Sequence, residues 1–134
     1  MRNIDEVILH CSDTRMDQNF DIEDIRRWHV SDNGWSDVGY HFVILLDGTI
    51  QKGRDLDIAG AHCKNHNSTT IGVCLMGGKK ADGSKWDAPT KAQKDSFVIL
   101  RLALDIVTGK ELQVSPHSKY STKSCPNFDI DKLI

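Results

Sequence analysis

Short apolar segments alternate with polar segments along the chain, and their lengths are typical of β-strands. Three such segments of about six residues are rich in aliphatic and β-branched side chains, as expected for largely buried strands: 6–11, 41–46 and 71–76. The pair Asp47-Gly48 follows the second segment, and residues 50–52 continue beyond it. Because Asp-Gly favours a tight turn between antiparallel strands, we expect a hairpin there. Another short strand is expected from Gln113 onward.

Two other segments have apolar residues at the spacing of an α-helix. Asp21 is a suitable N-cap for a helix over residues 22–32, and Gly34 is expected to end it. Thr90 precedes a longer helix that is expected to run to about Thr108 and to end at Gly109. The apolar stripe of this second helix consists of Phe97, Leu100, Leu104 and Val107.

Strands and helices are mixed within a chain that shows no repeat, no low-complexity segment and no linker. After the strand at residue 113, a polar loop leads to a brief final helix near 129–133. A length of 134 residues fits one compact domain. We therefore predict a single α/β domain over residues 1–134, with a mixed central β-sheet flanked by helices. The pattern does not define the order of the strands.

Charge and hydropathy exclude several classes of partner. The 17 basic and 19 acidic side chains give a net charge of −2, so there is no polybasic surface for a nucleic acid or a membrane. The apolar runs are far shorter than the roughly 20 residues needed for membrane insertion. The first residues include Asp5 and Glu6 and contain no apolar leader, which predicts synthesis in the cytoplasm without a signal peptide.

The four cysteines do not form a recognisable disulfide or zinc-ribbon pattern. Cys11 and Cys74 lie within apolar runs, where a buried free thiol is the usual state. Cys63 lies in a polar loop, and Cys125 directly precedes a proline. No two cysteines are separated by two residues, so we expect free thiols or metal ligation.

Two histidines and a cysteine are candidate metal ligands. Catalytic zinc needs three protein ligands and an open fourth position for water. His10 ends the first strand, while His117 and Cys125 flank a polar loop between Pro116 and Pro126. This pattern alone occurs in many sequences by chance. A hydrogen-bonded core histidine and an inert buried thiol therefore remain open as the alternative.

Ordered motifs from residue 9 to about residue 133 resemble the zinc-dependent N-acetylmuramoyl-L-alanine amidases. The similarity is greatest to the short lysozyme-type endolysins of bacteriophages, which are relatives of the peptidoglycan recognition proteins. The motifs are residues 9–14, 25–29, 34–42, 47–49, 53–54, 61–62, 65–68, 71–75 and 123–129. The resemblance implies the fold of that family, Zn²⁺ as cofactor and peptidoglycan as substrate.

Position by position, the resemblance implies zinc ligands at His10, His117 and Cys125. Tyr40 falls on the catalytic tyrosine of the family, and Lys123 falls on its catalytic lysine. Many bacterial members have an aspartate where Cys125 stands, so this chain resembles the thiolate-bearing branch. In the implied reaction, water activated by zinc attacks the amide between the lactyl group of N-acetylmuramic acid and L-alanine. Lys123 would stabilise the oxyanion, and Tyr40 would hydrogen-bond the water.

Five further residues have less specific positions. His62, in an Ala-His loop, is expected either to contact substrate or to be a surface residue. Trp35 follows the first helix and is a candidate for lining a sugar-binding cleft. His41 lies on the opposite strand face from the preceding tyrosine and is expected to be structural. His29 and His66 are expected at the surface.

Other functions remain to be weighed against the amidase. A peptidoglycan-binding module without activity is the main alternative, although such relatives typically lack the ligand cysteine. A peptidase with Cys125 as nucleophile and His117 as base would leave His10, Lys123 and Tyr40 without a role. The phage relatives include a member that also inhibits the RNA polymerase of the phage through its N-terminal segment. Only nine residues precede His10, so we do not predict that interaction.

The cellular setting follows from the same resemblance. A phage endolysin is made in the host cytoplasm without a signal peptide and reaches the cell wall through a separate membrane pore. We expect this chain to act in that way, as a monomer, on host peptidoglycan.

Overall fold

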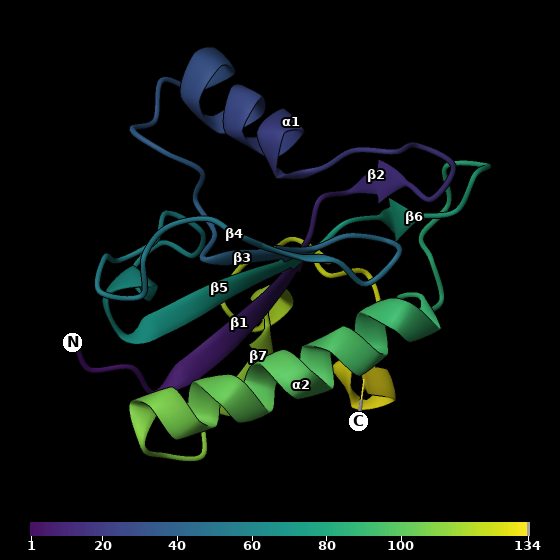
Figure 1. Cartoon of the computed structure of the whole chain (residues 1–134). Helices are drawn as coiled ribbons and strands as arrows, with labels where there is room; N and C mark the ends of the chain where they lie inside the picture. The colour runs from purple at the N-terminus through teal and green to yellow at the C-terminus, as the bar shows by residue number, and fades with distance from the viewer. Residues whose placement is uncertain (134) are drawn as a thin grey trace.

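A five-stranded mixed β-sheet forms the centre of the molecule. The computed structural model describes residues 1–133, and the strand order is β4-β3-β5-β1-β7. The strands are β1 (Glu6–Cys11), β3 (Phe42–Ile44), β4 (Ile50–Lys52), β5 (Thr70–Leu75) and β7 (Gln113–Pro116). All neighbouring pairs are parallel except the β3–β4 hairpin. Figure 1 shows the sheet between α1 (Ile22–Arg26) and α2 (Lys91–Thr108), as the predicted α/β class requires.

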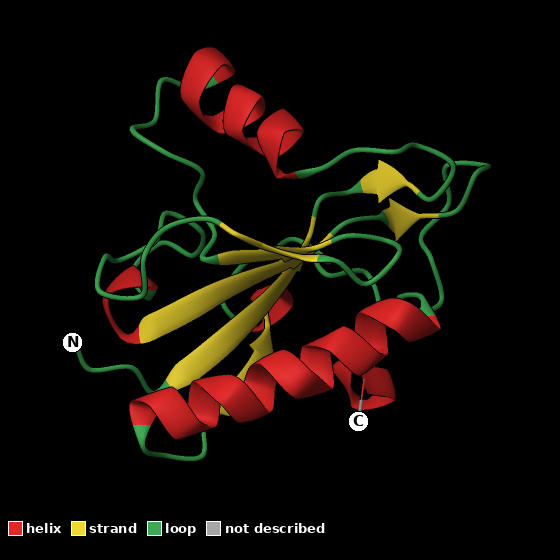
Figure 2. Ribbon diagram, in the orientation of Figure 1, coloured by secondary structure: helices red, strands yellow, loops and turns green. Residues whose placement is uncertain are grey.

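Strands β1 and β5 are buried on both faces, which explains their continuous apolar sequences. Because side chains alternate along a strand, neighbouring residues of β5 join different cores. Ile71, Val73 and Leu75 belong to the core that includes the α2 residues Phe97, Leu100 and Leu104. Cys74 belongs to a smaller core with Ile22 and Ile25 of α1. The sheet therefore separates two apolar layers, and Figure 2 shows the helices that lie on its two sides.

The long helix α2 begins and ends where the sequence predicts. The Thr90 hydroxyl accepts a hydrogen bond from the Gln93 N–H, and the Gln93 side chain accepts one from the Thr90 N–H. This reciprocal pair satisfies amides at the helix start that have no partner within the helix. Gly109 follows the helix in the left-handed conformation, with φ of 74°. Val107 was predicted on the buried stripe but is 57% exposed. One turn after Leu104, the residue that faces the sheet is the half-buried Thr108.

The first helical segment has the predicted bounds but not uniform α geometry. Asp21 caps α1 through the N–H of Glu23, as expected. The second half, η1 (Arg27–Asp32), has the wider turn of a π-helix, and Asn33 N–H donates to the Trp28 carbonyl five residues earlier. π-helical turns are frequent at functional sites. This one carries His29.

Several short elements complete the chain. Two strands of two residues each, β2 (Thr14–Arg15) and β6 (Gly78–Lys79), form a small parallel pair that the sequence pattern did not reveal. The remaining elements are 3₁₀ turns: η2 (Asn67–Thr69), η3 (His117–Lys119) and η4 (Ile130–Leu133). The last of these occupies the position of the predicted final helix. Within residues 1–133, no helix is long and apolar enough to span a bilayer.

Candidate metal centre

The pairing of β1 with β7 brings two histidines together from opposite ends of the sequence. The strands are parallel neighbours, and Leu9 lies opposite Pro116. The next residues along each strand direction are His10 and His117. Because paired strands lie about 4.8 Å apart, their side chains meet at this edge of the sheet. The ring centroids of His10 and His117 are 4.4 Å apart.

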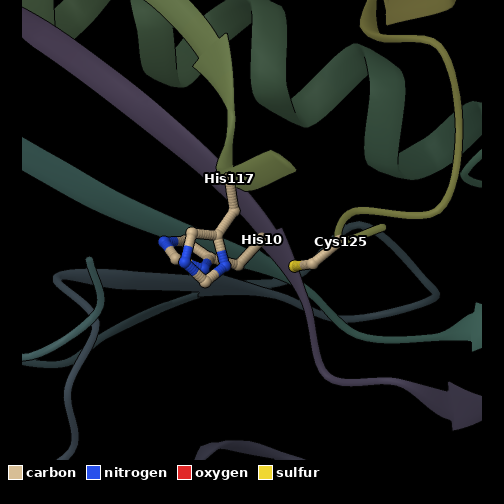
Figure 3. Close-up of side chains that lie close together, drawn as sticks. All are labelled: His10, His117 and Cys125. Atoms are coloured by element: carbon tan, nitrogen blue, oxygen red, sulfur yellow. The ribbon is translucent and has the colours of Figure 1, made fainter. Parts of the chain in front are cut away.

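A loop after η3 adds the third candidate ligand. The backbone N–H of Cys11 donates a hydrogen bond to the Cys125 Sγ at 3.2 Å, and the Ser118 N–H donates to the Cys125 carbonyl at 2.9 Å. These bonds hold the thiol beside the two rings. One potential ligand atom each from His10, His117 and Cys125 lies within 4.8 Å of the others. Figure 3 shows the two rings and the sulfur converging from their separate segments.

The local environment favours the protonation states that metal ligation needs. Burial lowers the pKa of His10, which keeps the imidazole neutral. Hydrogen bonding with the Cys11 thiol, and then with the His10 and His117 rings, lowers the pKa of Cys125 against the opposing effect of burial. The same contact and burial raise the pKa of Cys11. Cys125 is therefore the cysteine that becomes a thiolate, and thiolate and neutral imidazole are the forms that bind metals.

These three side chains fit a zinc ion. Two imidazoles and one thiolate are a known donor set for catalytic zinc, with bonds of about 2.0–2.3 Å. Ligand atoms around a tetrahedral ion of that size lie roughly 3.3–3.8 Å apart. The spacing of up to 4.8 Å here needs only small side-chain adjustments. The fit rests on donor chemistry and on the convergence of the three atoms.

A cleft of about 660 Å³ opens directly onto this cluster. All seven residues that the sequence analysis singled out line it: His10, Trp35, Tyr40, His62, His117, Lys123 and Cys125. A second hollow, of about 700 Å³, runs along α2, but none of the seven candidates lines it. We therefore take the smaller cleft as the functional one, because the chemistry-bearing side chains converge there.

Tyr40 and Lys123 both line this cleft but differ in their surroundings. The Tyr40 ring centroid is 5.0 Å from that of His10. Burial raises the pKa of Tyr40, so its hydroxyl stays protonated and able to donate a hydrogen bond. Lys123 is exposed. Among residues 1–133 no carboxylate forms an ion pair with it, which leaves its charge available to a bound ligand.

The burial and contacts of His62, Trp35 and His41 show where each of these less specific candidates lies. His62 is 9% exposed, so a surface position is wrong, and its Nδ1 lies 2.9 Å from the His10 Nε2. Trp35 is 38% exposed and lies against the His29 ring along the cleft. His41 is fully buried between the Gly72 N–H and the Ile58 carbonyl, which agrees with the predicted structural role.

Sequence reasoning did not assign several residues of the cleft wall, among them His29, Lys79 and Lys85. His29, expected at the surface, is half-buried there, and its Nδ1 accepts a hydrogen bond from the Gly39 N–H at 2.9 Å. That bond holds the turn before Tyr40. Lys79 of β6 and Lys85, which follows it in a segment with no recognisable motif, also line the cleft. Two signals in the sequence pointed to His29: it belongs to the family motif of residues 25–29, and it lies close to Trp35 along the chain.

The remaining sequence predictions concern the four cysteines and His66. All four cysteines are free thiols, as expected. Cys63 is buried although its loop is polar. His66 is half-buried and stacks on Tyr120 at a centroid distance of 3.9 Å, so it is not a simple surface residue.

The fold and cleft define an α/β domain with a candidate metal site at one edge of its sheet. More specifically, the chain belongs to the N-acetylmuramoyl-L-alanine amidase family, which matches residues 1–128. The endolysin of Klebsiella phage KP32 is 41% identical over 95% of this chain and 83% of its own length. The endolysin of Escherichia phage T7 is 41% identical over 96% and 83%.

Solved structures show the same architecture. The N-acetylmuramoyl-L-alanine amidase LysC from Clostridium intestinale superposes with a TM-score of 0.82 at 26% identity, over 98% of this chain and 83% of LysC. Wild-type Drosophila PGRP-LB has a TM-score of 0.80 at 24% identity, over 95% and 76% of the two chains. The second comparison shows the shared fold.

Proposed function

We propose that this protein is a zinc-dependent amidase of peptidoglycan. It cleaves the bond between the lactyl group of N-acetylmuramic acid and L-alanine. The observation that carries the proposal is the convergence of His10, His117 and Cys125 with Tyr40 and Lys123 in one cleft. The family match and the endolysin relatives support the same substrate class.

Each ligand has a defined part in holding the ion. His10 is presented by a rigid central strand, and His117 by the end of the neighbouring strand. Cys125 contributes the negative charge from the loop that its hydrogen bonds secure. A zinc ion held by these residues would polarise the scissile carbonyl and lower the pKa of a bound water towards neutrality.

Tyr40 and Lys123 supply the remaining polar chemistry. The protonated Tyr40 hydroxyl can orient the attacking water or the carbonyl of the substrate. Lys123 places an unpaired cation at the cleft, where it stabilises the oxyanion that develops as the amide carbonyl is attacked. Trp35 offers an aromatic surface to the sugar. In this proposal His10, His117 and Cys125 hold the metal, whereas Tyr40 and Lys123 act on the reacting atoms.

The biological setting is proposed on the same basis. The protein acts on the host cell wall as a phage endolysin, in monomeric form, after leaving the cytoplasm through a separate pore. The endolysin relatives of comparable length support this setting.

Removing the thiolate tests the function directly. We expect the parent protein to hold one zinc per chain and to release amino groups from purified peptidoglycan. Cys125→Ala should lose both properties while its circular dichroism stays that of a folded protein. Cys63→Ala, which removes a buried thiol outside the cleft lining, should keep both. Metal analysis and an amino-group assay are the measurements.

The alternatives give different outcomes in the same assays. Stoichiometric zinc without release of amino groups would identify a peptidoglycan-binding module instead. Activity that survives complete removal of metal by a chelator would indicate a cysteine peptidase that uses Cys125 and His117. Full activity of Cys125→Ala would contradict the assigned ligand set.

A further inference from the structure

A buried series of hydrogen bonds runs behind the metal centre. The His10 Nε2 lies 2.9 Å from the His62 Nδ1, and the His62 Nε2 lies 3.2 Å from the Thr70 hydroxyl. That hydroxyl donates to the carbonyl of His66 at 2.7 Å. His10, His62 and Thr70 are 2%, 9% and 1% exposed, so these bonds have little competition from water. None of the chemistry described above uses this series.

The direction of each hydrogen bond follows from the last acceptor. A carbonyl oxygen can only accept, and a threonine hydroxyl has a single proton to give. Thr70 gives its proton to the His66 carbonyl and must therefore accept from the His62 Nε2–H. The neutral His62 ring then has a lone pair at Nδ1, which must accept from the His10 Nε2–H. The His10 Nδ1 is left unprotonated.

This arrangement selects the tautomer of His10 that a metal requires. An imidazole binds a metal through a nitrogen that carries no proton, while its other N–H is held by a hydrogen-bond acceptor. We propose that His62 is a positioning residue that keeps the His10 Nδ1 free for zinc and fixes the orientation of the ring. This inference rests on the proposed zinc site. It assigns His62 a role that differs from substrate contact.

Close packing fixes His62 itself. A Cβ atom at Gly72 would lie 2.6 Å from the His62 Cγ, and one at Gly60 would lie 2.7 Å from its Cδ2. Only the lack of a side chain at these two positions makes room for the ring. The backbone is held as well, because the N–H groups of His62 and Cys63 both donate to the Asn67 side-chain oxygen at 3.0 Å.

The hydrogen bonds also argue against substrate contact by the polar atoms of His62. Both ring nitrogens already have protein partners at 2.9 and 3.2 Å. A substrate group would have to displace one of them within a buried site, and that would leave a polar atom of His10 or Thr70 unpaired. The structure therefore favours a role through His10.

Zinc affinity distinguishes a positioning role from a merely structural one. We expect His62→Leu to weaken zinc binding about 10–100-fold, as is typical when the hydrogen-bond partner of a metal-ligating histidine is lost. His62→Asn retains an acceptor near the Nδ1 position and should recover most of the affinity. Leu104→Ala, which weakens the core beside α2, should leave the affinity unchanged. The measurement is competition with a chelator of known zinc affinity.

The tautomer of His10 provides a second measurement, which needs no metal and does not depend on any His62 variant. ¹⁵N–¹H NMR of the metal-free parent at neutral pH should show His10 protonated at Nε2 and His62 protonated at Nε2. Thr70→Val removes the final acceptor and should disturb both signals, whereas Thr70→Ser should restore them. A His10 ring protonated at Nδ1 in the parent would overturn the proposal even if every His62 variant failed to fold.

The outcomes separate this inference from the proposed function. If the parent binds zinc and folded His62→Leu binds it equally tightly, the positioning role is wrong and the zinc site stands. If the parent binds no zinc, the proposed function is wrong, and so is the proposal that His62 positions His10 for zinc. In that case the NMR result still decides whether the hydrogen-bond series has the direction deduced here.

Discussion

Lys123 illustrates how much of the site depends on single charges. Its ammonium group is exposed at the cleft and has no ion-pair partner among residues 1–133, so its position costs little desolvation. We expect Lys123→Ala to lower kcat roughly 10²–10³-fold, the usual effect of losing one group that stabilises an oxyanion. KM and zinc content should change little, because Lys123 is not a ligand. Steady-state kinetics on a defined muropeptide would measure this.

Lys119 provides the matched control for that substitution. It is also exposed and lies near the same loop, but it approaches the Tyr120 ring and does not line the cleft. Lys119→Ala should therefore keep the parent kcat. An equal loss in both variants would mean that overall charge, and not a specific cation, controls the rate.

At the scale of elements, α2 separates buried from exposed apolar residues. Leu104 is 3% exposed within the main core, whereas Ile106 is 81% exposed on the outer face. Leu104→Ala should lower the free energy of unfolding by about 2–5 kcal/mol, since it leaves a cavity. Ile106→Ala should change it by less than about 0.5 kcal/mol. Urea unfolding of both variants would show the contrast, and equal costs would contradict the assigned helix orientation.

The same helix shows where sequence patterns succeed and where they stop. Thr90 and Gly109 marked its ends correctly because capping and left-handed turns are local properties. The stripe from Phe97 to Leu104 was also identified correctly. The prediction for Val107 was wrong, because several exposed positions of α2 are apolar too. Without a fully polar outer face, the sequence pattern does not define the edge of the buried stripe. The two-residue strands β2 and β6 are too short to carry any periodicity.

At the scale of the whole molecule, the buried histidines make stability depend on pH. Burial lowers the pKa of His41 to about 4, below the value near 6.5 of an unfolded chain. Between these values the unfolded state binds more protons, so stability falls as the pH drops from about 6.5 to 4. The contribution of His41 is about 3 kcal/mol. The lowered pKa values of His10, His29 and His62 act in the same direction.

Urea unfolding of the metal-free protein between pH 7 and pH 4 would test this dependence. His41→Asn keeps an acceptor for the Gly72 N–H but removes the titrating ring. Its unfolding free energy should therefore vary less with pH than that of the parent, even if it is lower at neutral pH. Identical slopes for the two proteins would exclude His41 as a contributor.

The sequence by itself determined the α/β class, the approximate bounds of the longer elements and the three candidate metal ligands. Local periodicity and capping account for the elements, and the ordered family motifs account for His10, His117 and Cys125. Only the tertiary structure decided the strand order, which makes β1 and β7 neighbours across more than a hundred residues of sequence. It also decided the hydrogen bonds from His10 through His62 to Thr70. The physical reason is that a sequence pattern records each residue's local environment, whereas pairing between distant segments depends on how all the buried faces pack together.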